Sequence, residues 1–104
     1  MGTRKKSKAA KFLEGLTGGP LTMGKILISI RVGEEMTQAE FAKILGISRS
    51  NLCDIEKGRR FISAEMAAKF AESLGDSKKQ FIRIALQDQL NRVGLKYHVN
   101  IDAA

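Results

Sequence analysis

Four side chains between residues 49 and 57 could contact the edges of DNA bases. Arg49, Ser50, Cys53 and Asp54 are polar or small, and their positions i, i+1, i+4 and i+5 place them on one face of a helix. A guanidinium can bind O6 and N7 of guanine together, and a carboxylate can accept a hydrogen bond from N4 of cytosine. A surface helix that faces only water would show the same pattern, so the surrounding elements must decide between the two interpretations.

The helix that precedes these residues has a complete set of start signals. Thr37 and Glu40 have the spacing of a capping box, in which each side chain binds the backbone N–H of the other residue. Met36 and Phe41 have the spacing of a hydrophobic staple across the same helix start. The sequence therefore predicts a helix that begins at Gln38.

The second helix follows after a very short connection. Ser48 can cap it, while Ile47 and Leu52 are spaced as a second staple. Only Gly46 and Ile47 connect the helices, and Gly46 can adopt the left-handed conformation without a Cβ penalty, as Gly58 can at the far end. Two helices joined so tightly must cross steeply.

The order of residues in this stretch resembles the helix-turn-helix of the phage repressor and Cro family, also called XRE-like regulators. The family pattern is T-Q-x-x-L-A-x-x-L-G-[IV]-S-x-x-x-[IV]-S-x-I-E-x-G. Phe41 and Leu52 are apolar substitutions within it, and Cys53 replaces the commoner serine. The resemblance covers residues 22–75, about half of the chain, and many matches at fixed spacing make it specific. The matches are Thr37, Gln38, Ala42, Leu45, Gly46, Ile47, Ser48, Ile55, Glu56 and Gly58.

The resemblance implies that the start of the second helix reads bases in the major groove. Arg49 and Ser50 are then the first base contacts, joined one turn later by Cys53 and Asp54. Asp54 departs from the amide that is common in the family, so it either accepts from cytosine or orients Arg49. The single cysteine is interpreted as a small packing or methyl-contact residue rather than a redox switch, because no second cysteine could resolve it.

Other matching positions imply phosphate contacts and a structural ion pair. In the family, a glutamate at the position of Glu56 pairs with an arginine of the first helix, and Arg31 occupies that place. Gln38 matches a position that grips phosphate with its side chain and backbone N–H. Further phosphate contacts, which set register rather than sequence, are expected from Asn51, Lys57, Arg59 and Arg60.

Most of the positive charge lies at the start of the chain. The 104 residues carry a net charge of +7 at pH 7, and five of these charges lie in residues 1–11, which hold no acid. An anionic partner such as nucleic acid or an acidic membrane surface is indicated. We expect residues 1–20 to form a basic arm that adds affinity for DNA, ahead of a helix-turn-helix domain over residues 21–94.

Cofactor, membrane and catalytic functions are not expected. One cysteine allows neither an internal disulfide nor a CxxC metal site, so no metal or other cofactor is predicted. No apolar run approaches the roughly 18 residues of a membrane span, and no secretory signal is recognisable, so we expect a cytoplasmic protein. The only histidine, His98, has no nucleophile or metal ligand at a recognisable spacing, and an enzyme is therefore not expected.

The end of the chain predicts a dimer. The fifth helix, residues 78–93, has two apolar stripes, and a small domain can bury only one of them. After Gly94 apolar and polar residues alternate, which predicts a β-strand over residues 95–101; the alternative is an extended disordered tail. The strand is expected to pair with its copy about a two-fold axis. The expected dimer residues are Leu86, Leu90, Val93, Leu95, Tyr97, Val99 and Ile101.

These features predict an all-α, five-helix repressor-like domain with a C-terminal strand and tail over residues 95–104. The favoured function is a dimeric repressor that reads double-stranded operator DNA with the helix over residues 48–57. The alternative is an antitoxin of a type II toxin–antitoxin pair, which binds a toxin protein and represses its own operon. A third hypothesis is a protein-binding module of the same fold without an operator.

Overall fold

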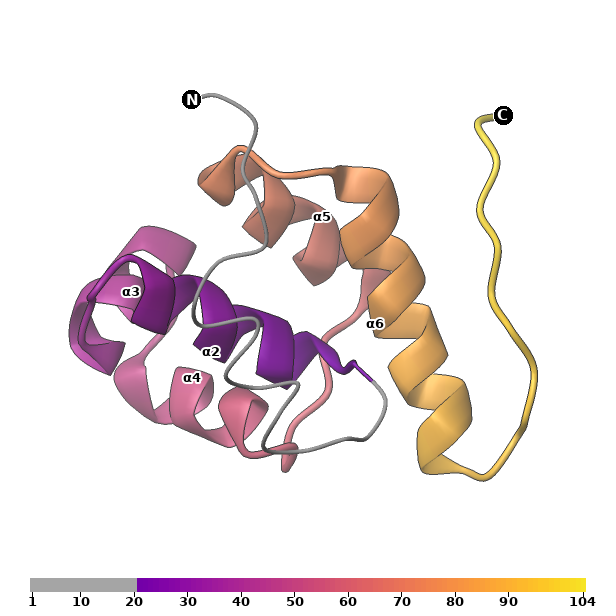
Figure 1. Cartoon of the computed structure of the whole chain (residues 1–104), viewed down its shortest axis with the longest axis horizontal. Coiled ribbons are helices and arrows are strands. Elements are labelled where there is room, and N and C mark those ends of the chain that lie inside the picture. The colour runs from indigo at the N-terminus through magenta and orange to yellow at the C-terminus, as the bar shows by residue number, and fades with distance from the viewer. Residues whose placement is uncertain (1–20) are drawn as a thin grey trace.

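Five α-helices make up the described part of the chain, residues 21–104, in a computed structural model (Figure 1). The expected basic arm, residues 1–20, lies outside the described residues. The predicted all-α class with five helices is confirmed, and none of these helices is long and apolar enough to cross a membrane. The helices are α2 (Met23–Gly33), α3 (Gln38–Leu45), α4 (Arg49–Glu56), α5 (Ala64–Leu74) and α6 (Lys78–Arg92).

Every helix begins after a serine or threonine whose hydroxyl oxygen accepts a backbone N–H from the first turn. At α3 the capping box is complete: Thr37 Oγ1 accepts from Glu40 N at 3.1 Å, and Glu40 Oε1 accepts from Thr37 N at 2.9 Å. At α4, Ser48 Oγ accepts from Asn51 N at 3.0 Å. Both predicted starts are confirmed, because capping is decided by residues a few positions apart. The caps are Thr22, Thr37, Ser48, Ser63 and Ser77.

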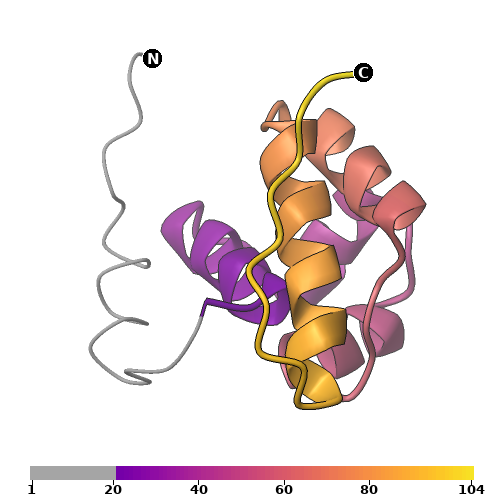
Figure 2. The same cartoon turned by 90° about the vertical axis from the view of Figure 1, so that its right-hand side faces the viewer.

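The core lies between α2, α3, α4 and α5, and α6 covers one side of it by packing along α5 (Figures 1 and 2). Gly46 turns the chain between α3 and α4 with φ at 76°. Gly24 lets α2 approach the end of α4 so closely that a Cβ there would collide with the carbonyl oxygen of Ile55. The largest fully buried side chains are Phe41, Phe70, Met23, Leu27 and Leu52.

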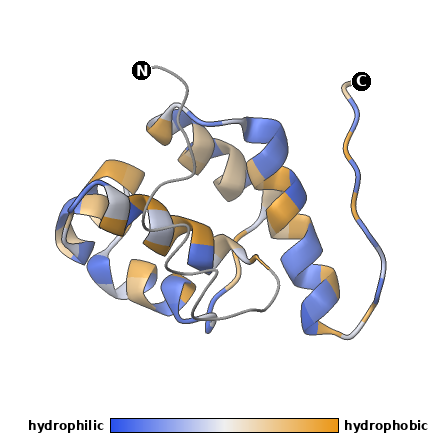
Figure 3. Cartoon of the chain, viewed as in Figure 1, coloured by the Kyte–Doolittle hydropathy of each residue, from blue (hydrophilic) through white to orange (hydrophobic). Residues whose placement is uncertain are grey.

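The predicted β-strand after Gly94 is wrong, because residues 95–104 and the rest of the described chain contain no strand. The tail is extended and runs back beside α6, and its hydropathy alternates as the sequence indicated (Figure 3). The Gln87 side chain on α6 holds it: Gln87 Nε2 donates to the Tyr97 carbonyl at 2.7 Å, and Gln87 Oε1 accepts from Val99 N at 2.9 Å. A side-chain amide thus satisfies backbone groups that a β-ladder would otherwise bind.

The two apolar stripes of α6 differ in burial. Phe81, Ile84 and Ala85 are buried against the core. Leu86 and Leu90 on the other stripe are half-buried, and Val93 just beyond the helix is 66% exposed. The stripe that faces the domain also carries a carboxylate, Asp88, at the position four residues after Ile84.

Asp88 fastens α6 to the first residue of α2. The residue is only 6% exposed, and its Oδ2 accepts a hydrogen bond from Met23 N at 2.9 Å. Its Oδ1 has no hydrogen-bond partner in the described part of the chain. Burial raises the pKa of the Asp88 carboxyl above its ordinary value of 3.8, while the Met23 N–H and the charge of Lys25 act against that rise.

The stability of the Asp88→Asn variant should depend less on pH than that of the unmodified protein. Because the pKa is raised in the folded state, protonation of Asp88 contributes to the stability of the fold. This contribution is fully present below about pH 4 and is lost as pH rises through the folded-state pKa. Asparagine keeps an oxygen for Met23 N and does not ionise. The free energy of unfolding of the variant, measured in urea relative to the unmodified protein, should therefore rise from about pH 4 to pH 7. A difference that is constant across this range would contradict the prediction.

Candidate nucleic-acid interface

Arg31 and Glu56 form a two-point ion pair between α2 and the end of α4. Arg31 Nε lies 2.8 Å from Glu56 Oε2, and Arg31 Nη2 lies 3.1 Å from Glu56 Oε1. Their side chains are 19% and 3% exposed, and Arg31 Nη1 also donates to the Met36 carbonyl at 3.3 Å. The guanidinium offsets the cost of placing a carboxylate at the negative end of a helix. The pair therefore fixes α4 relative to α2.

Gln38 extends this pair to the first residue of α4. Its Nε2 donates to Glu56 Oε1 at 2.9 Å, and its Oε1 accepts from Arg49 Nη1 at 3.0 Å. A continuous chain of hydrogen bonds thus runs from Arg31 through Glu56 and Gln38 to Arg49. The family resemblance implies a phosphate contact for Gln38 and gives no sign of this bridge, because Gln38 and Arg49 meet only through the crossing of α3 and α4.

The four expected base contacts all lie on α4. Arg49 and Ser50 are exposed at its start, and Cys53 and Asp54 are half-buried one turn later. Asp54 Oδ1 lies 3.4 Å from Arg59 Nη1, so its carboxylate is directed to the loop after α4. Of the two roles considered for Asp54, orientation of Arg49 is therefore not found, since Arg49 binds Gln38 instead.

Candidate phosphate contacts flank this face at both ends. Gln38 lies beside the start of α4, whereas Lys57, Arg59 and Arg60 are exposed in the loop that follows its end. The backbone N–H groups of Arg59 and Arg60 both donate to the Asp54 carbonyl, at 2.8 and 3.2 Å, so the loop folds back against the helix. Asn51 is half-buried in the first turn of α4. Polar or basic groups therefore lie at both ends of the face that could read bases.

The residues expected to form a dimer lie on α6 and the tail, at the right of Figure 1, and none of them belongs to α4. Val93, Leu95 and Tyr97 are 66%, 46% and 69% exposed. Leu86, Leu90, Val99 and Ile101 are half-buried against their own chain. Among the residues expected to form the dimer, the most exposed apolar side chains thus lie in the turn after α6 and at the beginning of the tail.

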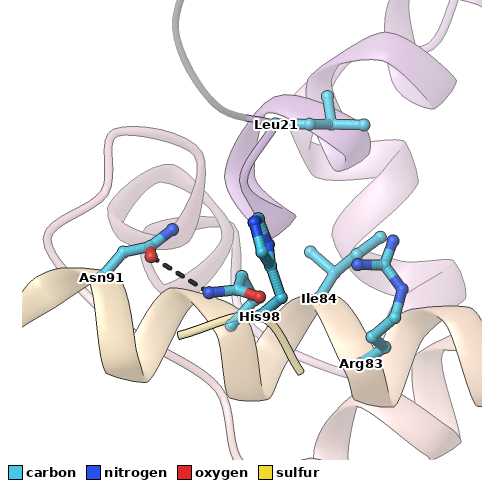
Figure 4. A pocket seen from close by; sticks show the side chains of 6 residues that line it. Leu21, Arg83, Ile84, Asn91 and His98 are labelled. Atoms are coloured by element: carbon cyan, nitrogen blue, oxygen red, sulfur yellow. Dashed lines mark hydrogen bonds between the residues drawn. The ribbon is translucent and has the colours of Figure 1, made fainter. Parts of the chain in front are cut away.

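His98 borders a cavity of about 390 Å³ between the start of α2, α6 and the tail (Figure 4). Its imidazole projects from the tail past Ile84. No group of three or more His, Cys, Asp or Glu side chains within residues 21–104 is arranged to hold a metal ion. The cavity is lined by Leu21, Arg83, Ile84, Gln87, Asn91 and His98.

Comparisons with known proteins match the region that holds this interface. A family profile described as a helix-turn-helix domain matches residues 24–86, from α2 into α6. The protein Antitoxin PezA from Streptococcus pneumoniae serotype 4, strain TIGR4, is 43% identical over 44 residues, or 42% of this chain. The match covers 28% of the length of that antitoxin. No solved structure matches the chain.

Proposed function

Because the chain belongs to the helix-turn-helix domain family, we propose that it is a transcriptional regulator that reads operator DNA in the major groove with α4. The observation that carries the proposal is the hydrogen-bonded chain from the buried Glu56 through Gln38 to the exposed Arg49. One N–H of the Arg49 guanidinium is used in that chain, which leaves other donors for guanine O6 and N7. A guanidinium held in place before binding loses less conformational entropy when it meets a base.

Binding-site selection from a pool of random duplexes tests this proposal directly. The purified chain should enrich one sequence, because Arg49 and its neighbours on α4 present distinct donors and acceptors to the base edges. We expect two related half-sites about 34 Å apart, one turn of DNA, if two copies bind together. A pool that shows no enrichment, with binding equal for every sequence, would rule out sequence-specific regulation.

The proposed regulator acts as a homodimer and represses by occupying its operator. One copy of α4 spans only a few base pairs, so a second copy is needed for a site of useful length. The exposed apolar side chains of Val93, Leu95 and Tyr97 support a contact between copies, since such groups are stabilised by burial. Sedimentation of a Leu95→Ser/Tyr97→Ser variant should show a monomer, whereas the control variant Lys96→Ser, on the same segment, should still sediment as a dimer.

An antitoxin function is the second candidate, and the likeness to Antitoxin PezA favours it. It would add a toxin-binding surface to the DNA-binding function, for which α6 and the tail are available. If the reading frame next to this gene encodes the toxin, its expression alone should arrest growth, and co-expression of this chain should restore it. A neighbouring protein that is harmless on its own would count against this function.

A further inference from the structure

The end of α6 returns to the loop that follows α4. Helices α5 and α6 run in roughly opposite directions, and the longer α6 extends past the start of α5, along the loop that leads into α5 (Figures 1 and 2). The guanidinium carbon of Arg92 lies 4.4 Å from the centroid of the Phe61 ring in this loop. One turn earlier on α6, Asp88 binds the start of α2. These two contacts hold the end of α6 beside the loop.

Arg92 adds a fourth positive charge to this region. Lys57, Arg59 and Arg60 are exposed in the loop, and Arg92 is exposed in the last turn of α6. Two acidic residues lie close to this group, and both have other partners: Asp54 is paired with Arg59, and the buried Asp88 accepts a hydrogen bond from Met23 N. No acidic side chain within residues 21–104 forms a salt bridge with Arg92. The basic surface made of Lys57, Arg59, Arg60 and Arg92 therefore joins the end of α4 to the end of α6.

The stack on Phe61 leaves Arg92 suited to bind an anion. A guanidinium attracted to the face of an aromatic ring keeps its N–H groups around its edge, where they can donate in the plane. Planar paired donors match the oxygens of a phosphate. Because the stack already restricts the side chain, less conformational entropy is lost when a phosphate is bound.

We propose that Arg92 is a DNA-backbone contact, so that the interface extends from α4 and its loop onto α6. This inference rests on the proposed function. DNA is favoured as the anionic partner because Arg92 continues a row of basic residues that begins directly after α4. The tail begins at Leu95, three residues after Arg92.

The salt dependence of DNA binding tests the proposal. Each phosphate contact that is lost should reduce the slope of log K against log salt by about 0.9 for duplex DNA. The Arg92→Met variant keeps an apolar side chain over Phe61 and loses the charge, and Arg92→Gln is a second neutral variant. The matched control is Lys79→Met, which removes the same charge from the exposed first turn of α6.

We expect the slope to be reduced in Arg92→Met and Arg92→Gln, and to stay close to that of the unmodified chain in Lys79→Met. The unfolding midpoint of each variant shows whether it is folded. Arg92→Lys should keep the slope, because the charge is retained, and lose some affinity with the stack. Equal slopes for Arg92→Met and Lys79→Met would overturn the proposed contact while leaving DNA binding intact. If the unmodified chain binds no DNA, the proposed function itself fails, and the two results are distinguishable.

Discussion

Replacing Arg31 with methionine is expected to lower the free energy of unfolding by about 3 kcal/mol, because it leaves a buried carboxylate without its cation. Glu56 is 3% exposed in its side chain, and only the amide of Gln38 would still bind it. Urea unfolding at pH 7 measures the loss. The same substitution should also weaken DNA binding, since Gln38 and Arg49 are positioned through Glu56.

Two further variants separate the buried pair from an ordinary ion pair. Lys69→Met breaks an exposed ion pair, in which Lys69 Nζ lies 3.8 Å from Glu65 Oε2. This substitution should leave the free energy of unfolding nearly unchanged. The double variant Arg31→Met/Glu56→Met removes both buried charges and should recover much of the stability. DNA binding should not recover with it, because the acceptor for Gln38 is gone. An Arg31→Met loss no larger than that of Lys69→Met would show that the pair contributes little.

The helix starts could be predicted because their causes are local. Thr37, Glu40 and Ser48 act on backbone groups within three residues of themselves, so the sequence contains all the information needed. The left-handed turn at Gly46 is local in the same sense. The extent of α3 and α4, and hence which residues α4 exposes, followed from these signals.

The contacts that complete the interface are not local. Gln38 and Arg49 lie 11 positions apart, and Arg92 meets Phe61 only because α5 and α6 fold back on each other. Asp88 could have been noticed, because it lies four residues after Ile84 on the stripe that becomes buried. Its apolar neighbours give the signal, but the partner, Met23 N, cannot be read from the pattern.

The tail shows how periodicity can mislead. Alternating apolar and polar residues indicate an extended chain with two different faces, and they do not say what binds its backbone. Here Gln87 binds the Tyr97 carbonyl and Val99 N, so part of the tail is held without a neighbouring strand. The apolar side chains of Leu95 and Tyr97 stay exposed, so the proposed dimer is held by side-chain contacts and not by a shared β-ladder.

Replacing Arg49 with alanine is expected to reduce the ratio of specific to random DNA binding by about 10- to 100-fold, the effect of losing one two-point contact with guanine. The substitution leaves Gln38 bound to Glu56, so α3 and α4 should keep their positions and the unfolding free energy should change little. Titration of the selected operator and of a scrambled duplex at one salt concentration gives the ratio.

The matched control for this measurement is Lys57→Ala, in the loop after α4. A phosphate contact carries no sequence information, so its loss should weaken binding to both duplexes about equally and leave the ratio unchanged. Arg49 and Lys57 lie at opposite ends of α4 and carry the same charge, and a general electrostatic effect would therefore alter both variants alike. Unchanged specificity in Arg49→Ala would mean that the start of α4 does not read bases, whatever the affinity. If the ratio of specific to random binding falls only in Arg49→Ala, base recognition is assigned to Arg49, the exposed end of the hydrogen-bonded chain through Glu56 and Gln38.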